Sequence, residues 1–316
     1  MNLFELPILE RLEGAERILI SGAGGGFDIF AGLPLAFALR QRGKKVVLSN
    51  LSFTYLGGTD AEFVMPALAR VTQHTQGESK YFPERYLCQW FASRGEPEAI
   101  YCFEKVGVAP LRAAYARVIK EHDIDALVLV DGGTDILMRG DEAGLGTPQE
   151  DMTSLAAVAA LDVPIRVVTC LGFGIDAFHG VCHAQFLENV AALDAAGGYL
   201  GAHALQLGME EGRLFQDAVE FVHARMPERQ SIVNGSILSA LQGHFGDHHR
   251  TDRTRTSKLF INPLMTLYWH FELKAVAGRA LYLHLLEGTQ SVFDVQAIIE
   301  AFRHDVPIRE RVPIPV

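Results

Sequence analysis

Five short apolar runs rich in β-branched residues lie within the first 170 residues of the chain. They are RILIS at residues 17–21, KVVLS at 45–49, AIYCF at 99–103, ALVLV at 126–130 and IRVVTC at 165–170. Continuous apolar runs of this length are typical of parallel strands that are buried on both faces. Helical stretches separate them, including residues 109–121 and 152–161. The alternation predicts an α/β protein with a Rossmann-like, doubly wound and mostly parallel sheet.

The pattern changes after Gly197. Long amphipathic stretches at residues 210–224, 263–286 and 292–302 predict helices, and residues 230–233 are a candidate strand. We therefore expect a sheet of about six strands with a helical C-terminal part. Because no linker or repeat divides the sequence, we expect one domain over residues 1–316, with a sheet-forming core at 1–197 and a mostly helical completion at 198–316.

Composition places the chain among ordinary globular proteins, with 49% hydrophobic and 21% charged residues. No apolar run reaches the roughly 18 residues that a membrane helix requires. The start of the chain lacks a basic region before a cleavage site, and the four cysteines show no CxxC spacing. Both features favour a cytoplasmic protein without a disulfide framework or a zinc-thiolate site.

The net charge of −10 argues against general nucleic-acid binding, which needs a basic face. One segment, HHRTDRTRTSK, gathers Arg250, Arg253, Arg255 and Lys258. It is either a solvated basic loop or a place that holds one phosphate or carboxylate group.

A glycine-rich turn, SGAGGGFD, follows the first predicted strand, where ligands collect in an open parallel sheet. Its glycines allow positive φ angles and close approach of the backbone to an anionic or hydroxylated ligand; they are Gly22, Gly24, Gly25 and Gly26. Phe27 stands where a dinucleotide fingerprint needs its third glycine. The second predicted strand ends in Ser49 and Asn50, where an NAD-binding fold usually has an acidic residue that binds the ribose, so NAD is disfavoured. Asp28 is either a helix cap or a ligand-facing group, and Pro34 requires that a helix from Asp28 is bent or begins near Leu33.

The densest cluster of acidic residues and glycines follows the fourth run, in the block DGGTDILMRGDEAGLGTPQED at residues 131–151. We expect Asp131 and Asp135, with Gly132 and Gly133, to bind a divalent cation, grip sugar hydroxyls or act as acid and base. Other acids of the block have simpler expected roles. A capping box of Thr147, Pro148 and Glu150 is expected to start a helix, whereas Asp141 and Glu142 are expected to be solvated loop residues.

A third turn follows the fifth run and reads CLGFGIDAFHGVCH. If a helix begins near Phe178, His179 and His183 lie on one face at i, i+4, with Asp176 near the helix start. These three side chains are candidates for metal binding or proton transfer, and the alternative is ordinary packing of the histidines.

At these three motifs the sequence resembles the DUF1152 family. The matching segments read GAGGGFD, VDGGTDILMRGDEAGLGTPQED and LGFGIDAFHG, between Ile18 and His183. Phe27, Thr134 and Thr147 depart from the family pattern. The resemblance implies a Rossmann-like fold and carries no established activity.

The sequence favours an enzyme that acts on a nucleotide, a nucleoside or a phosphosugar-like molecule, by hydrolysis or group transfer, at the carboxyl ends of the strands. Asp131, Asp135, Asp176, His179 and His183 are the candidate catalytic residues, and Asp131 and Asp135 the candidate cation ligands. Two alternatives remain open, a non-catalytic nucleotide sensor and an atypical nicotinamide or flavin enzyme. The expected partner is a small phosphate- or ribose-bearing molecule, with no nucleic acid and no membrane, and the apolar C-terminal helices are a candidate homo-oligomer interface.

Overall fold

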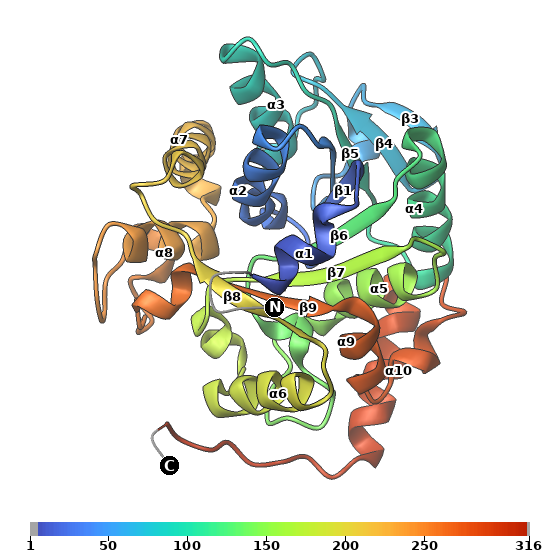
Figure 1. Ribbon diagram of the computed structural model, residues 1–316, viewed down its shortest axis with the longest axis vertical. Helices are drawn as coiled ribbons and strands as arrows, with labels where there is room; N and C mark the ends of the chain where they lie inside the picture. The colour runs from blue at the N-terminus through green and yellow to red at the C-terminus, as the bar shows by residue number, and fades with distance from the viewer. Residues whose placement is uncertain (1–5, 315–316) are drawn as a thin grey trace.

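The computed structural model describes residues 6–314 of the chain. Within these residues one mixed sheet contains nine strands, in the order β3-β4-β5-β2-β1-β6-β7-β9-β8 (Figure 1). The strands are β1 (Arg17–Gly22), β2 (Lys45–Leu51), β3 (Glu62–Met65), β4 (Leu68–Val71), β5 (Ile100–Phe103), β6 (Ala126–Asp131), β7 (Ile165–Cys170), β8 (Tyr199–Ala204) and β9 (Leu267–Glu272).

Helices cover both faces of this sheet (Figure 1). The core on one face includes residues of α1 (Pro7–Glu13), α2 (Asp28–Gln41), α3 (Pro83–Ser93), α7 (Glu210–Arg225) and α8 (Ile232–Leu241). The core on the other face includes residues of α4 (Val108–His122), α5 (Pro148–Ala159), α6 (His183–Ala195), α9 (Leu273–Arg279) and α10 (Val292–Asp305). Among the described residues, no helix combines the length and the apolar character needed to cross a membrane.

The five predicted runs form the parallel centre of the sheet. β5, β2, β1, β6 and β7 lie side by side, and each neighbouring pair is parallel. Their apolar side chains alternate between the two cores, with Ile18 and Ile20 on one face of β1 and Leu19 on the other. The prediction of buried parallel strands is thus confirmed for each run.

The expected number of about six strands is wrong, because antiparallel strands extend the sheet at both edges. β3 and β4 form a hairpin beside β5, and β9 and β8 follow β7. The hairpin strands are only four residues long, and β3 has no buried residue. Such strands lack the continuous apolar signal that identified the central five.

The C-terminal part is partly helical, as the amphipathic pattern predicted. α7 and α10 cover the stretches expected at 210–224 and 292–302. The strand expected at 230–233 is wrong, because α8 begins at Ile232. The helix expected at 263–286 is also wrong: β9 (Leu267–Glu272) interrupts it, with short helical segments on either side. Periodicity alone does not separate a short buried strand from a buried helix.

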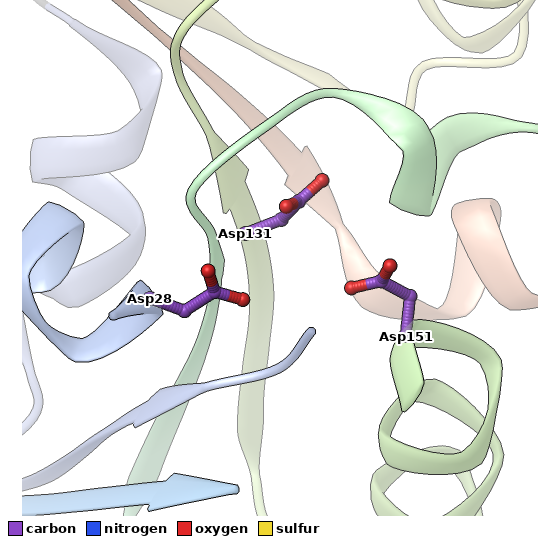
Figure 2. A group of neighbouring side chains, drawn as sticks. All are labelled: Asp28, Asp131 and Asp151. Atoms are coloured by element: carbon purple, nitrogen blue, oxygen red, sulfur yellow. The ribbon is translucent and has the colours of Figure 1, made fainter. Parts of the chain in front are cut away.

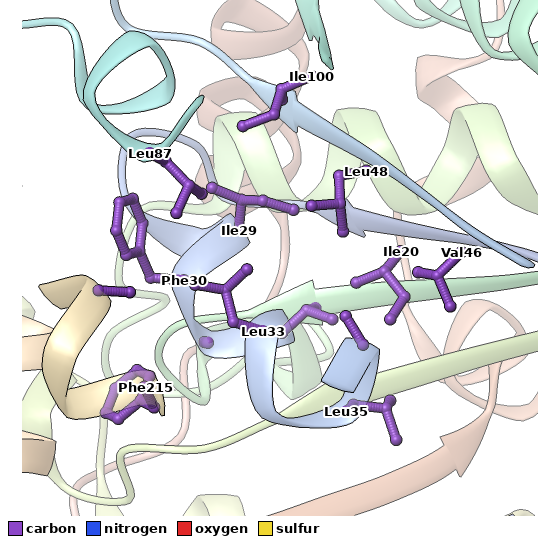
Figure 3. Close-up of a cluster of buried hydrophobic side chains, with 14 of the residues drawn as sticks. Ile20, Ile29, Phe30, Leu33, Leu35, Val46, Leu48, Leu87, Ile100 and Phe215 are labelled. Atoms are coloured by element: carbon purple, nitrogen blue, oxygen red, sulfur yellow. The ribbon is translucent and has the colours of Figure 1, made fainter. Parts of the chain in front are cut away.

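α2 is the helix that places the first candidate site residue. It begins at Asp28 and continues through Pro34, so the alternative start near Leu33 is wrong. The helix is apolar on nearly all sides because it lies between the sheet and α7 (Figure 3). Gly32 permits this close packing, since a Cβ atom there would lie 2.6 Å from the Ile20 side chain.

Candidate functional site

The site lies where β1 and β6 end side by side. These strands are parallel neighbours, and the chain leaves β1 for α2 on one face and leaves β6 for α5 on the other. Connections that diverge in this way open a crevice at the carboxyl ends of the strands. Figure 2 shows carboxylates from α2, β6 and α5 pointing into this crevice.

Three aspartates meet there. Asp28 is the first residue of α2, Asp131 is the last residue of β6, and Asp151 lies in the first turn of α5. One carboxylate oxygen of each lies within 4.8 Å of the others. Asp151 is 1% exposed, and neither of its carboxylate oxygens has a hydrogen-bond partner among the described residues. A buried carboxylate without a partner is costly, so this arrangement demands a proton or a cation.

The glycines around the aspartates make room for their carboxylates. A Cβ atom at Gly24 would lie 2.6 Å from Oδ1 of Asp151 and 2.8 Å from Oδ2 of Asp28. A Cβ atom at Gly132 would lie 2.8 Å from Oδ1 of Asp28. These positions therefore exclude any side chain because the acidic groups already fill the space.

The amide groups of the glycine-rich turn are largely used by the protein itself. Gly24 N donates to Oδ2 of Asp28 over 2.6 Å, and Gly26 N donates to the carbonyl of Leu51 over 3.1 Å. Gly25 and Gly26 adopt the expected positive φ angles of 93° and 63°. The turn thus positions Asp28, which is the first residue of α2 and not its cap. Gly24 and Gly25 line the cleft, and their binding of a ligand stays a prediction.

Asp135 and Asp176 lie beside this group, and both are anchored by hydrogen bonds. Thr147 donates to Oδ2 of Asp135 from its backbone N at 2.6 Å and from its hydroxyl at 3.0 Å. Thr134 donates to Oδ2 of Asp176 from its backbone N at 2.7 Å. The expected capping box is therefore wrong: α5 does begin after Thr147, but the threonine side chain binds Asp135 rather than its own helix.

Gly133 leaves the space that allows Asp176 to lie close to Asp131. A Cβ atom at Gly133 would lie 2.9 Å from both oxygens of Asp176 and 3.1 Å from Oδ1 of Asp131. Asp131 itself accepts one hydrogen bond, from the backbone N of Ile136 at 3.2 Å. Asp131 and Asp135, predicted from one motif, and Asp176, predicted from another, therefore lie in the same cleft.

Burial raises the pKa of these carboxyl groups, and their mutual repulsion adds to the shift. The pKa of Asp28 rises to about 8, because burial outweighs the hydrogen bond from Gly24. The pKa values of Asp131 and Asp151 rise well above the ordinary range through burial, then through neighbouring carboxylates. Burial likewise raises the pKa values of Asp135 and Asp176. Without a cation, these five carboxyl groups cannot all be ionised at neutral pH.

The two candidate histidines are separated. Ile175–His179 is a short 3₁₀ helix, and α6 begins only at His183, so the expected i, i+4 pair on one helix is wrong. Gly180 intervenes with a φ of 95°, which turns the chain. His179 lines the acidic cleft, whereas His183 lines a different, mostly apolar pocket beside Phe173 and Cys182.

The acids of residues 131–151 divide between the cleft and the framework. Contrary to expectation, Asp141 and Glu142 are not solvated: they are buried, and both interact with Arg309. Glu150 is paired with Lys105 at 3.3 Å instead of closing a capping box. The sequence interpretation did not select Asp151, although it lies in the acidic block, because spacing alone does not reveal that α5 returns its first turn to the end of β6.

The aspartates form one wall of a cleft of about 550 Å³. Lys105 and Arg253 contribute positive charge to the same cleft, and Phe53 and Phe178 contribute aromatic surface. Both phenylalanines are exposed, at 44% and 72% of their surface. The cleft thus combines acidic, basic and aromatic groups around one space.

The donor set fits a hard divalent cation. Carboxylate oxygens are preferred ligands of Mg²⁺, Mn²⁺ and Ca²⁺. Ligands on opposite sides of such an ion, with bonds of about 2.1–2.4 Å, lie about 4.2–4.8 Å apart. The oxygens of Asp28, Asp131 and Asp151, all within 4.8 Å of one another, therefore match the span of one ion. Of the two predicted ligands, Asp131 belongs to this group of three and Asp135 does not; cation binding itself stays a prediction.

Comparison with known proteins identifies the family. A family model described as "Protein of unknown function (DUF1152)" matches residues 59–304. The match begins after the glycine-rich turn and includes Asp131, Asp135, Asp151 and Asp176. Searches of curated proteins and of solved structures found no match. Because the family model covers most of the sequence, the chain belongs to the DUF1152 family.

Proposed function

We propose that the protein is a hydrolase or group transferase that depends on a divalent cation and acts on a nucleotide, a nucleoside or a phosphosugar-like molecule. The observation that carries this proposal is Asp151, whose buried carboxylate has no hydrogen-bond partner within residues 6–314 and faces Asp28 and Asp131. Stable proteins rarely leave a buried carboxylate unsatisfied, so a bound cation is the simplest reason to retain three together.

The residues of the cleft support distinct roles. Asp28, Asp131 and Asp151 would hold the cation, which supplies polarisation of a substrate oxygen and activation of water for attack. Asp135 is oriented by two hydrogen bonds from Thr147, and His179 lines the same cleft. These two side chains are the candidates for proton transfer. His183 is not part of this proposal because it lines another pocket.

The fold supports the same location. Numbered along the chain, the five parallel strands lie in the order 3-2-1-4-5, which favours the proposed Rossmann-like assignment. In that topology ligands bind where the strand order reverses, between the first and fourth parallel strands, here β1 and β6. Asp28 and Asp131 follow those two strands.

The test is cation binding followed by turnover. Isothermal titration with Mn²⁺ should detect a site in the wild-type protein that is lost in Asp131→Asn and Asp151→Asn, whereas the exposed Asp162→Asn serves as control. A panel of nucleotides, nucleosides and sugar phosphates with Mn²⁺, analysed by mass spectrometry, should then yield a product. Absence of cation binding would refute the proposal. Ligand binding without product would favour the sensor, and visible absorbance of bound flavin the flavin enzyme.

A further inference from the structure

A second hollow of about 450 Å³ adjoins the acidic cleft. The two hollows are neighbouring compartments of one site because they share lining residues, which are Gly25, Asp28, Phe53, His179, Ile232, Val233 and Arg253. The second hollow is less acidic, because the residues that line it alone carry no carboxylate; they are Gly26, Phe27, Tyr81, Arg229, Ser231 and Asn234.

Two arginines give this hollow its positive charge. Within the described residues, neither Arg229 nor Arg253 forms an ion pair, although neighbours in the same basic segment do: Arg250 pairs with Glu220, and Arg255 with Asp252. Nη1 of Arg253 donates to the carbonyl of Gln230 over 2.6 Å. This bond orients the guanidinium group and leaves its other donors for a ligand.

The first turn of α8 lines the same hollow. α8 is ten residues long, and residues 231–234 at its start all contribute to the lining. The first amide groups of a helix have no partner within the helix, and the helix dipole makes this end attractive to anions. Ser231 satisfies only the amide of Asn234, over 3.1 Å. The positive end of α8 and the two arginines therefore act on one space.

Asn234 supplies an independent sign of a ligand. It is 1% exposed, and its Oδ1 atom has no hydrogen-bond partner among the described residues. Its orientation is fixed because Nδ2 donates to the carbonyl of Phe27 over 3.2 Å and to Ser231 over 3.1 Å. A buried acceptor without a donor is costly, and a hydroxyl group of a ligand would satisfy it.

We propose that this second hollow is the subsite for the phosphate group of a hydroxylated phosphate ester. Arg229, Arg253 and the start of α8 would bind the phosphate, and Asn234 would accept from a sugar hydroxyl. The inference rests on the proposed function and adds to it the position of the substrate phosphate. A protein with a net charge of −10 and a carboxylate-rich cleft would otherwise repel such an ester.

Ribose 5-phosphate is a suitable probe, measured by isothermal titration in Mn²⁺ and again in a chelator. Arg229→Gln and Arg253→Gln should each weaken its binding in Mn²⁺ by about tenfold or more, since a charge-assisted bond contributes about 1.5–3 kcal/mol. Arg255→Gln, an exposed arginine two residues away that does not line the hollow, is the matched control and should change binding less than about twofold. All three side chains are exposed, so folding is not at risk, and melting curves check this.

Binding that is insensitive to Arg229 and Arg253, or equally sensitive to Arg255, would overturn the subsite, as would failure of the wild-type protein to bind the probe. Mn²⁺ titrations of the same variants separate the two proposals. Unchanged Mn²⁺ binding with weakened ester binding supports both. If the wild type binds no Mn²⁺ but binds the ester in chelator through Arg253, the cation-dependent function fails and the subsite stands.

Discussion

Removing the charge of Asp151 should stabilise the protein in the absence of cations, which is the reverse of the usual effect of altering a buried residue. An Asp151→Asn variant keeps the size of the side chain and removes its charge. Asp151 is 1% exposed, its carboxylate has no hydrogen-bond partner in the part of the chain that the structure describes, and oxygens of Asp28 and Asp131 lie within 4.8 Å. The wild-type protein therefore bears an electrostatic cost at this position that the variant avoids.

The structure sets the size of this cost. Two unit charges 4.8 Å apart repel by about 3.5 kcal/mol at an effective dielectric constant of about 20. Holding a proton on an ordinary carboxyl group at pH 7 costs about 4 kcal/mol, so the Asp151 carboxyl group takes up a proton wherever its charge would cost more than that. Protonation therefore limits the electrostatic cost of Asp151 in the wild type to about 4 kcal/mol. The amide group of Asp151→Asn is itself buried without a partner among the described residues, which reduces the gain in the free energy of unfolding to about 2 kcal/mol.

Thermal unfolding provides the assay. For 316 residues, a gain of about 2 kcal/mol corresponds to a Tm about 3 °C higher than the wild type in chelator. Mn²⁺ at about 100 times its Kd should stabilise the wild type by about 2.7 kcal/mol and leave the variant unchanged. The difference between the Tm values of the variant and the wild type should therefore vanish or change sign when the cation is added.

Asp162→Asn removes one exposed charge and should change stability by less than about 0.5 kcal/mol. A Tm for Asp151→Asn that lies below the wild type in chelator would contradict the reasoning, because the carboxylate would then have a stabilising partner. Equal stabilisation of variant and wild type by Mn²⁺ would remove Asp151 from the cation site.

Three further predictions follow from the same geometry. Between about pH 6.5 and 8, in chelator, the free energy of unfolding should fall as pH rises. Asp28 has a pKa of about 8 in the folded protein and about 3.9 in the unfolded protein, so the folded state binds one more proton in this range. The Asp28→Asn variant should therefore flatten the slope by up to about 1.4 kcal/mol per pH unit. Gly24→Ala should weaken Mn²⁺ binding by about tenfold, because its Cβ would lie 2.6 Å from Oδ1 of Asp151, whereas Gly278→Ala, with nothing within 4 Å, should not. Glu142→Gln should lower the free energy of unfolding by about 2 kcal/mol in urea titrations, since this buried carboxylate accepts only from N–H donors, at 2.8–3.0 Å; an unchanged midpoint would contradict that role.

The sequence by itself determined the centre of the fold and the edge at which the site lies. Apolar runs such as residues 126–130 must be buried on both faces, and a strand that ends in Asp131 delivers that carboxylate to the carboxyl end of the sheet. The acids and glycines of residues 131–151 were recognised for the same reason. The edge strand β3 was not recognised, because its four residues, none of them buried, carry too little periodicity.

Only the tertiary structure decided which acids meet. Asp28 and Asp151 come from helices on opposite faces of the sheet, and they converge because both helices begin at the crevice between β1 and β6. Glu142, equally acidic in the sequence, instead accepts from Asn189 and the Arg139 amide inside the framework. The local sequence pattern determines where a residue lies along a helix or strand. The packing of elements that are far apart in the chain determines the neighbours of that residue. These neighbours decide whether a carboxylate can be a cation ligand or a structural hydrogen-bond acceptor.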